Sequence, residues 1–251
     1  KMFNFKKVKR ARKILNYLTS ILFKIFQINL RYKEKRKDYG VEIFEYFYLP
    51  WNNDKFFIDT HDKIKEYTIN PISRLYTIYE YSKTYLKKDS TFIEVGCWKG
   101  GVSGLVALTN KKKNIDIFSC DTFTGVKNAT NQDSFFNNDE YSDASREDIK
   151  KVEEIANAKI KIIEGIFPES FKEIKLEKPL SMAHIDVDTY ISAKESFQFL
   201  SNNLMNGGLI ILDDYGGWFT DGITKFGNEL KGDKNFFVVP NHLGQLIIFK
   251  K

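Results

Sequence analysis

Four aspartates lie at the ends of two apolar segments that have the character of buried strands. Asp186 and Asp188 follow one segment, and Asp213 and Asp214 follow another. The carboxyl ends of parallel strands meet at one edge of a sheet, where such sheets bind their ligands. Carboxylates gathered there repel one another unless a cation lies between them, and an all-oxygen ligand set favours Mg²⁺ or a similar hard ion. The pattern predicts a divalent-metal site at Asp186, Asp213 and Asp214.

The same residues also have a purely structural interpretation, because Asp and Thr at a strand-to-helix turn often act as helix N-caps. We expect this capping role for Asp188 or Thr189, and not for the other three aspartates. His184 lies two residues before Asp186, so the two side chains share a strand face. His184 is either a packed strand residue, which is the commoner case, or a group that supports the metal site.

A glycine-rich turn, residues 94–101, follows the first predicted strand and opens directly into a helix. Gly96 allows a tight turn and the close approach of a ligand, while Glu94 offers a carboxylate at the strand end. Asp121, at the tip of the second predicted strand, can accept hydrogen bonds from both hydroxyls of a ribose. The turn does not match the G-x-G-x-x-G pattern of dinucleotide sites. Glu94 alone is explained equally well as a surface acid, but the three residues together predict a pocket for a cationic nucleoside.

Strands and helices alternate along most of the chain, which is typical of a parallel α/β sheet. Strands are predicted over residues 91–95, 115–120, 159–163, 180–185 and 209–212. Helices are predicted over residues 72–86, 102–108 and about 191–204, with one more from a Ser145 cap and a short one after Pro168. Asn70 and Pro71 supply an N-cap and a first-turn proline for the first of these helices.

Two further strands are predicted over residues 236–239 and 245–249, and only five residues join them. So short a connection implies an antiparallel hairpin. We therefore predict an α/β, doubly wound, mostly parallel seven-stranded sheet that ends in a C-terminal antiparallel hairpin. Residues 128–142 are rich in Asn and Asp and carry three aromatic residues, and we predict that they form a mobile loop or lid.

The composition places the chain among soluble globular proteins. The 251 residues suffice for one large domain, and 42% of them are hydrophobic and 29% charged. The formal net charge is +6, but residues 1–37 hold thirteen basic residues and a single acid, Glu34. The rest of the chain holds 26 basic and 32 acidic residues. Such a surface is poorly suited to phosphate backbones, so we predict no nucleic-acid partner.

The N-terminal segment differs from the rest. Residues 14–30 carry apolar side chains at helical spacing between basic flanks. Lys24 interrupts the apolar stripe and no small-residue cleavage site follows, so the segment suits neither a membrane span nor a secretory signal. We predict a basic amphipathic helix or tail over residues 1–38 and one domain over residues 39–251. The helix either contacts the anionic inner surface of a membrane or packs against the domain or a second subunit of a homo-oligomer.

The cysteines and histidines exclude two classes of protein. Cys97 and Cys120 lie in or beside predicted buried strands, with neither a metal-ligand spacing nor the density of a secreted disulfide framework. A reducing, cytoplasmic compartment fits them best. The three histidines are scattered along the sequence and form no zinc-binding cluster, so a zinc enzyme is not predicted.

Five ordered blocks of the sequence resemble the macrocin O-methyltransferase-like family of class I methyltransferases, which methylate sugar hydroxyls in antibiotic and glycan pathways. The resemblance spans about residues 65–250. The blocks are FIEVGCWKGG (92–101), DTFTG (121–125), GIFPES (165–170), IDVDTY (185–190) and GGLIILDDYG (207–216). Family members more often carry Cys-Gly-Val-Trp-Arg where this chain has Val95-Gly-Cys-Trp-Lys99, which is a mild departure.

The resemblance implies a class I methyltransferase with a pocket for S-adenosyl-L-methionine. It places Glu94, Gly96, Cys97 and Trp98 in that pocket. It also implies that Asp121 binds the ribose and that Ile166 lies against the adenine.

The resemblance further implies that Asp186 is both a metal ligand and the general base, with Asp213 and Asp214 completing the metal site. The implied reaction is the Mg-assisted O-methylation of a sugar hydroxyl on a small molecule or glycan. The Lys-, Asn-, Ile- and Phe-rich composition suggests an AT-rich bacterial genome, in which surface-polysaccharide biosynthesis is a plausible setting. Two alternatives are a catechol-type O-methyltransferase that acts on aromatic diols and a non-catalytic partner in a glycan-assembly complex.

Overall fold

The computed structural model describes residues 13–14, 17–18, 21, 48–136 and 140–251, and the chain divides into two compact units, Lys1–Pro50 and Trp51–Lys251. Within the first unit, the described residues between 13 and 21 are helical, and the amphipathic helix over residues 14–30 stays a prediction. Most of that helix and the predicted boundary at residue 38 lie outside the described residues. None of the helices in the described part of the chain has the length and hydropathy needed to cross a lipid bilayer.

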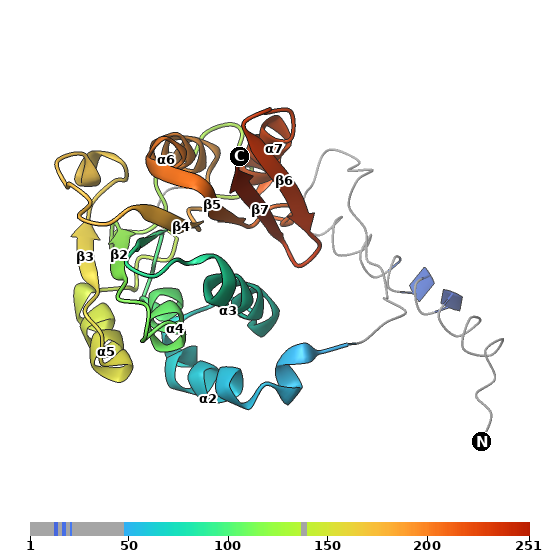
Figure 1. Cartoon of the computed structure of the whole chain (residues 1–251). Helices are drawn as coiled ribbons and strands as arrows, with labels where there is room; N and C mark the ends of the chain where they lie inside the picture. The colour runs from blue at the N-terminus through green and yellow to red at the C-terminus, as the bar shows by residue number, and fades with distance from the viewer. Residues whose placement is uncertain (1–12, 15–16, 19–20, 22–47, 137–139) are drawn as a thin grey trace, which may run out of the picture. The chain divides into compact units, whose positions relative to one another are not determined.

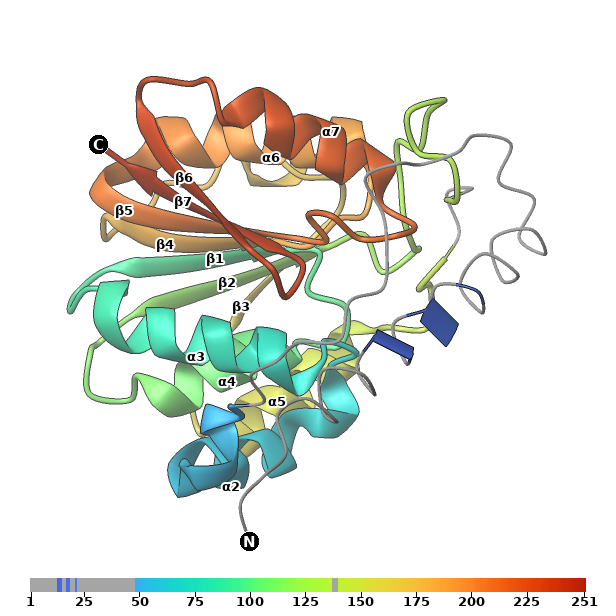
Figure 2. The ribbon, with the colours of Figure 1, turned by 90° about the vertical axis from the view of Figure 1, so that its right-hand side faces the viewer.

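A seven-stranded sheet forms the centre of the second unit, with the strand order β3-β2-β1-β4-β5-β7-β6 (Figures 1 and 2). The first five strands are parallel, β7 runs antiparallel to β5, and β6 and β7 form an antiparallel hairpin. The strands are β1 (Thr91–Val95), β2 (Asp116–Asp121), β3 (Lys161–Glu164), β4 (Leu180–Ile185), β5 (Leu204–Asp213), β6 (Phe236–Asn241) and β7 (Gln245–Lys250). The predicted fold class is confirmed.

Helices cover both faces of this sheet (Figure 2). One face carries α2 (Lys55–Ile64), α3 (Ile72–Tyr85), α4 (Gly101–Thr109) and α5 (Arg146–Ala156). The other face carries α6 (Tyr190–Asn203) and α7 (Asp221–Leu230). Short 3-10 turns lie at η1 (Pro50–Asn53), η2 (Lys65–Tyr67) and η3 (Glu169–Phe171).

Helices α2 and α7 are absent from the sequence-based prediction, although α2 carries a local signal. The Asp54 carboxylate accepts a hydrogen bond from the backbone N–H of Phe57 at 2.9 Å and so caps the helix. The buried residues of α2 are Phe57, Thr60 and Ile64, at helical spacing. In α7 two glycines, which are weak helix formers, lie within a ten-residue segment and obscure its apolar face.

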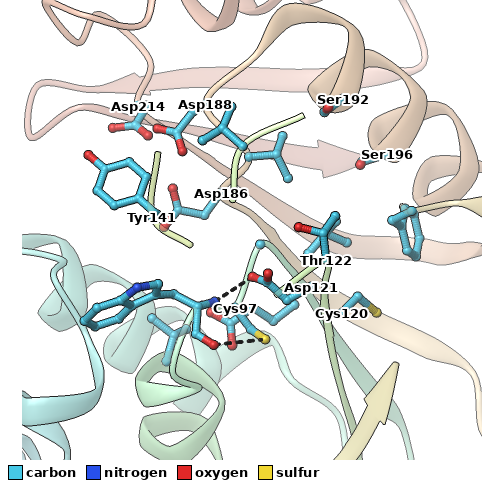
Figure 3. A pocket seen from close by; sticks show the side chains of 18 of the residues that line it. Cys97, Cys120, Asp121, Thr122, Tyr141, Asp186, Asp188, Ser192, Ser196 and Asp214 are labelled. Carbon is cyan, nitrogen blue, oxygen red and sulfur yellow. Dashed lines mark hydrogen bonds between the residues drawn. The ribbon is translucent and has the colours of Figure 1, made fainter. Parts of the chain in front are cut away.

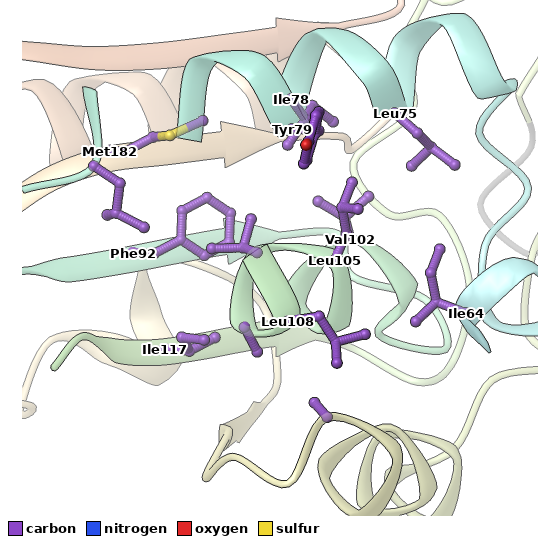
Figure 4. Packing of buried hydrophobic residues seen from close by; sticks show 14 of the residues in the cluster. Ile64, Leu75, Ile78, Tyr79, Phe92, Val102, Leu105, Leu108, Ile117 and Met182 are labelled. Atoms are coloured by element: carbon purple, nitrogen blue, oxygen red, sulfur yellow. The ribbon is translucent and has the colours of Figure 1, made fainter. Parts of the chain in front are cut away.

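Successive side chains along the central strands point to opposite faces of the sheet, and so toward different layers of helices. Phe92 of β1 and Met182 of β4 belong to the core beneath α3 and α4 (Figure 4), whereas the residues that follow them belong to the core against α6 and α7. Because side chains alternate along a strand, Glu94, His184 and Asp213 lie on the α3 side of three neighbouring strands. We call these three residues the buried polar row.

Candidate active site

A cavity of about 270 Å³ opens at the carboxyl ends of the parallel strands (Figure 3). Its lining combines the segment before α3 with the turns that follow β1, β2, β3, β4 and β5. This is the edge at which open α/β sheets bind ligands. The predicted site residues that line the cavity are Glu94, Gly96, Cys97, Trp98, Asp121, Ile166, Asp186 and Asp214. Asp213 lies behind them and is 1% exposed.

Gly96 joins the two halves of the cavity. Its φ is +81°, and a Cβ at this position would lie 1.8 Å from the carbonyl oxygen of Asp186. The backbone N–H of Asp186 also donates to the carbonyl of Val95 at 2.9 Å. From the sequence, glycine is expected here for a tight turn and for the approach of a ligand. The structure adds a second reason, because the turn after β1 packs directly against the turn after β4.

Asp121 ends β2 at the cavity surface and is held by the backbone. Its Oδ2 accepts a hydrogen bond from Trp98 N at 2.8 Å, and its Oδ1 accepts one from Phe123 N at 2.8 Å. Burial has the larger effect and raises the pKa of Asp121, while these hydrogen bonds act to lower it. Each carboxylate oxygen can accept a second hydrogen bond. Asp121 therefore retains acceptor capacity for hydroxyl groups.

The other predicted cofactor residues supply the less polar part of the lining. The indole of Trp98 donates to Asp143 at 2.8 Å, and the Lys99 ammonium lies 4.2 Å from the centre of its ring. Burial raises the pKa of Cys97 well above its usual value, so this side chain remains a neutral thiol. Ile166 lines the cavity and is 42% exposed, as suits an apolar surface that a flat ring can cover.

Glu94 lines the cavity while remaining engaged with the protein. Its Oε2 accepts a hydrogen bond from Ser103 Oγ at 2.5 Å, and its Oε1 lies 3.5 Å from His184 Nδ1. The Ser103 hydroxyl also lies 2.6 Å from Ser119 Oγ. Glu94 is thus the first member of the buried polar row, with a carboxylate fixed between helix α4 and strand β4.

His184 is the middle member of the row and carries a positive charge. Burial acts to lower its pKa, but hydrogen bonds with Asp213 and Glu94 outweigh that effect and raise the pKa to about 10. The imidazole is therefore protonated near neutral pH and donates to Asp213 at 3.0 Å. Both predicted interpretations apply to His184. It is a fully buried strand residue, and it also donates a hydrogen bond to Asp213 at the end of the neighbouring strand.

Asp213 is saturated by its own protein partners. Its Oδ1 accepts from Arg74 Nη1 at 2.7 Å and from Asp214 N at 2.9 Å. Its Oδ2 accepts from His184 Nε2 at 3.0 Å and from Gln245 Nε2 at 3.1 Å. Burial acts to raise the pKa of Asp213, but His184 and Arg74 lower it overall. The four hydrogen bonds account for the four acceptor positions of a carboxylate.

Besides Glu94 and Asp121, three further acids line the cavity. We call Asp186, Asp188 and Asp214 the cavity acids (Figure 3). Burial and the charges of Asp213 and Asp214 raise the pKa of Asp186 well above its usual value. Burial and Asp214 do the same to the pKa of Asp188. Burial and Asp213 raise the pKa of Asp214, although Arg74 opposes them. Full ionisation of these acids would thus leave more negative charge than Arg74 and His184 balance.

Asn70 does not cap α3, contrary to the prediction. Pro71 occupies the N-cap position and no side chain bonds to the first turn. The Asn70 amide instead donates to Asp186 Oδ2 at 3.0 Å. A partly buried carboxylate gains more from a hydrogen-bond donor than an exposed helix terminus gains from an acceptor, because water already solvates the terminus.

The predicted cap of α6 is also different. Thr189 occupies the N-cap position, but its side chain makes no capping bond and donates to the carbonyl of Lys127 at 2.9 Å. Asp133 accepts the bond from Tyr190 N at 2.9 Å, from a loop that is distant in sequence. Asp188 is therefore free of the capping role and joins the cavity acids, its carboxyl lying against that of Asp214.

The residues of this edge fit a hard divalent cation on the cavity side. His184, Asp186 and Asp213 each offer one atom, and these atoms lie within 4.8 Å of one another. That triad is a poor ligand set, because an imidazolium has no free lone pair and Asp213 is saturated. The cavity acids Asp186, Asp188 and Asp214 offer carboxylate oxygens, which Mg²⁺ prefers, together with uncompensated negative charge. Direct ligation by Asp213 stays a prediction.

Two cavity residues have no role in the sequence-based prediction. Arg74 pairs with Asp213 and Asp214, and Tyr141 lies beside the cavity acids (Figure 3). Burial, followed by the charge of Asp188, raises the pKa of Tyr141. The available signal for Arg74 was its position one helical turn after Asn70, which places both side chains on one side of the start of α3.

Comparison with protein families gives one match. The macrocin-O-methyltransferase (TylF) family model matches residues 66–237 of this chain, which is more than half of its length. The matched range contains every cavity residue discussed above. No curated protein matches the chain significantly.

Solved methyltransferase structures share the fold. The O-methyltransferase NovP superposes with a TM-score of 0.56 at 18% identity, covering 74% of this chain and 82% of its own. The calicheamicin methyltransferase CalS11 superposes with a TM-score of 0.59 at 11% identity, covering 86% of this chain and 99% of its own. The Podospora anserina methyltransferase PaMTH1, solved with SAH bound, has a TM-score of 0.54 at 13% identity, with 78% and 88% covered. At these identities the likeness shows the fold alone.

Proposed function

Because this chain belongs to the macrocin-O-methyltransferase family and is therefore an S-adenosylmethionine-dependent O-methyltransferase, we propose that it methylates a sugar hydroxyl with the assistance of a divalent cation. The observation that carries the proposal is a single cavity lined both by Asp121 and by the cavity acids. One set of residues suits a cationic nucleoside and the other suits a hydroxyl bound beside a hard cation. Their shared cavity brings the methyl donor and the acceptor together.

We assign the cofactor to the part of the cavity around the turn after β1. S-adenosylmethionine supplies an electrophilic methyl group on a positively charged sulfur. Asp121 has acceptor positions left for the ribose hydroxyls, and Glu94 contributes negative charge below the turn. Gly96, Cys97 and Trp98 supply the backbone and the less polar surface, and Ile166 supplies an apolar face for the adenine.

We assign the acceptor to the part of the cavity that the cavity acids line. A hard divalent cation lowers the pKa of a hydroxyl bound to it. Asp186 and Asp214 supply oxygen ligands from the cavity, and Asp213 is the third proposed ligand. Asn70 donates one hydrogen bond to Oδ2 of Asp186, so both oxygens keep acceptor positions, one for the cation and one to accept the hydroxyl proton as the general base. Asp188 is the alternative proton acceptor, because it lines the same cavity against Asp214.

Cofactor binding is the first test. Titration calorimetry with S-adenosylhomocysteine compares the full chain with Asp121→Ala and with Asp116→Ala, a matched control at the opposite end of the same strand. We expect Asp121→Ala to weaken binding by about tenfold or more, the value of a lost pair of hydrogen bonds to hydroxyls, and Asp116→Ala to leave it unchanged. A wild-type chain that fails to bind at tens of micromolar would contradict methyl transfer and favour a non-catalytic partner in a glycan-assembly complex.

The acceptor class is the second test. The protein is incubated with S-adenosylmethionine and two panels, sugars with vicinal hydroxyls and catechols, and methylated products are detected by mass spectrometry. We expect sugar products that disappear with EDTA and return with added Mg²⁺. Products from the catechol panel alone would replace this proposal by the catechol-type alternative, and turnover unaffected by EDTA would remove the cation from it.

The proposed setting is glycan or surface-polysaccharide biosynthesis at the inner face of a membrane. Its support is the basic character of residues 1–38. Co-sedimentation with anionic vesicles should retain the full chain and not a version that starts near Gly40. Equal sedimentation of both versions would favour packing of the N-terminal segment against a second subunit. Analytical ultracentrifugation of both versions measures the oligomeric state.

A further inference from the structure

Arg74 places a positive charge inside the acid cluster. It lies in the first turn of α3, and its Nη1 donates to Asp213 Oδ1 at 2.7 Å and to Asp214 Oδ1 at 2.8 Å. The side chain is 16% exposed and lines the cavity. One guanidinium nitrogen therefore bridges two carboxylates that the proposed function assigns to a divalent cation.

The C-terminal hairpin holds the guanidinium from its other side. Arg74 Nε donates to the carbonyl of Leu243 at 2.9 Å, in the turn between β6 and β7. The next residue is Gly244, whose φ is +93°. A Cβ on Gly244 would lie 2.3 Å from Arg74 Nη2. The turn between β6 and β7 thus packs directly against the guanidinium, with no room for a Cβ at Gly244 while Arg74 keeps its position.

The contacts of Arg74 consume acceptor positions that a metal ion would need. Asp213 already accepts four hydrogen bonds, so it can ligate a cation only by releasing one of its donors. Glu94 and His184 are buried and paired behind it, and Gln245 is buried as well. Arg74 is the charged donor that reaches Asp213 from the cavity side. Loss of its contact would free an acceptor position on Asp213 Oδ1 and another on Asp214 Oδ1.

We propose that Arg74 is a resident counter-cation of the acid cluster, which stabilises the metal-free protein and opposes the binding of a divalent cation. The proposal rests on the proposed function for the identity of the cation site. Two physical effects act in the same direction. Arg74 competes for oxygen lone pairs, and its charge repels a second cation at the short distances within the cluster. The opposite expectation is that Arg74 holds the carboxylates in position for the metal, in which case its removal weakens metal binding.

The first experiment measures the dissociation constant for Mn²⁺ by electron paramagnetic resonance in the absence of cofactor. It compares the full chain with Arg74→Met, which keeps the apolar stem and removes the charge. Lys83→Met is the matched control, because Lys83 lies on the same helix and pairs with Glu80 on the surface. We expect Arg74→Met to bind Mn²⁺ at least tenfold more tightly and Lys83→Met to stay within twofold of the wild type.

Thermal unfolding supplies an independent measurement on the same proteins. Without metal, Arg74→Met should melt several degrees below the wild type, because the carboxylates lose their counter-charge. Added Mn²⁺ should recover more of the melting temperature for Arg74→Met than for the wild type, since at a given concentration a tighter-binding ligand stabilises the folded state more. A melting temperature that falls equally with and without Mn²⁺ indicates a packing role and contradicts the proposal.

A second pair of variants tests the proposal without changing Arg74. Gly244→Ala must displace the guanidinium, whereas Gly207→Ala adds the same methyl group at a comparable positive φ of +73° with no atom within 4 Å. We expect Gly244→Ala to tighten Mn²⁺ binding severalfold and Gly207→Ala to leave it unchanged. If Arg74→Met fails to fold, the comparison of Gly244→Ala with Gly207→Ala still tests whether Arg74 opposes Mn²⁺ binding.

Unchanged or weaker Mn²⁺ binding in both Arg74→Met and Gly244→Ala would overturn the proposal, as would the absence of Mn²⁺ binding at millimolar concentration in every variant. S-adenosylhomocysteine binding separates this failure from that of the proposed function. A chain that binds the cofactor product normally and shows no response of Mn²⁺ affinity to Arg74 refutes the counter-cation role alone.

Discussion

Strand β2 begins and ends with an aspartate, and the two residues have opposite environments. Asp116, at the start, accepts hydrogen bonds from Lys178 at 2.8 Å and Lys161 at 3.0 Å. Burial acts to raise its pKa, but the two lysines lower it overall. Asp121, at the end, is held by backbone N–H groups, and burial raises its pKa. One edge of the sheet thus balances its acid with cations of the chain, and the other does not.

The same contrast extends across the carboxyl edge of the sheet. Among the described residues, Arg74 and His184 are the only cationic side chains that pair with the acids of the cavity and of the buried polar row. Uncompensated charge in a partly buried place lowers the stability of the folded state. Such an arrangement is typical of a site that completes its charge balance with ligands. The amino edge serves stability, and the carboxyl edge is arranged for binding.

The largest expected effect comes from removing charge at the carboxyl edge. Asp186→Asn keeps the size of the side chain and removes the proposed base and ligand, so kcat should fall by roughly 10²- to 10⁴-fold. Affinity for S-adenosylhomocysteine should stay within about threefold, because Asp186 is not assigned to the cofactor. Single-turnover kinetics and calorimetry measure the two quantities. A larger loss in Asp188→Asn than in Asp186→Asn would transfer the role of base to Asp188.

Breaking the buried polar row should have the largest effect on stability. Asp213→Ala leaves Arg74 and His184 buried and without their shared partner, so the free energy of unfolding should fall by about 3–5 kcal/mol. Urea denaturation monitored by circular dichroism measures this loss. Asp62→Ala removes an exposed partner of Lys65 and provides the control, with an expected change near zero. A loss similar in the two variants would mean that the row contributes little.

Replacing Asp188 should raise the stability of the metal-free protein, whereas replacing Asp213 should lower it. Asp188→Asn removes one of the repelling cavity acids, its amide can donate to Asp214, and asparagine tolerates the φ of +63° at this position. We expect the metal-free protein to gain roughly 1 kcal/mol in free energy of unfolding, at the expense of activity. Differential scanning calorimetry in EDTA tests this. Destabilisation of the metal-free protein would show that Asp188 is stabilised by contacts other than those described here.

An effect of similar size and opposite sign is expected at the amino edge of the sheet. Asp116→Asn should lower the free energy of unfolding by about 1 kcal/mol at pH 7, since a partly buried carboxylate loses two ammonium partners. The folded pKa of Asp116 is lowered, so its contribution is present above the unfolded pKa and is lost as pH falls through the folded value. The gap between wild type and variant, measured by urea denaturation, should therefore close on acidification below about pH 4. A gap independent of pH would contradict the ionic origin of the effect.

Much of the fold was predictable because its signals are local. Apolar runs indicated the seven strands, and the five-residue connection between the last two indicated the hairpin. Ser145 and Asp148 form the predicted capping box of α5, since both partners lie within one helical turn. Strand β5 begins at Leu204, five residues before its predicted start, because Leu204 pairs with Leu180 of β4 ahead of an irregularity in the register.

The membership of the site, by contrast, was predictable only in part. The acids at the strand ends could be assigned to one edge from the parallel topology alone, and the cavity does bring Asp121, Asp186 and Asp214 together. The hydrogen-bond partners of these acids could not be predicted from the sequence. Arg74 lies 139 residues from Asp213, Asn70 lies 116 residues from Asp186, and Asp133 caps a helix 57 residues away.

The sequence by itself determined the order along the chain of the strands and of most helices, the edge that collects the acids, and the family to which the chain belongs. Only the tertiary structure decided which acids are saturated by the protein and which remain open to the cavity. The reason is physical: hydrophobic periodicity and capping act within a few residues, whereas the charge of a buried carboxylate depends on every donor that folding brings within hydrogen-bond distance. Asp213 and Asp214 are adjacent in the chain and share Arg74, but only Asp213 is also bonded to His184 and Gln245.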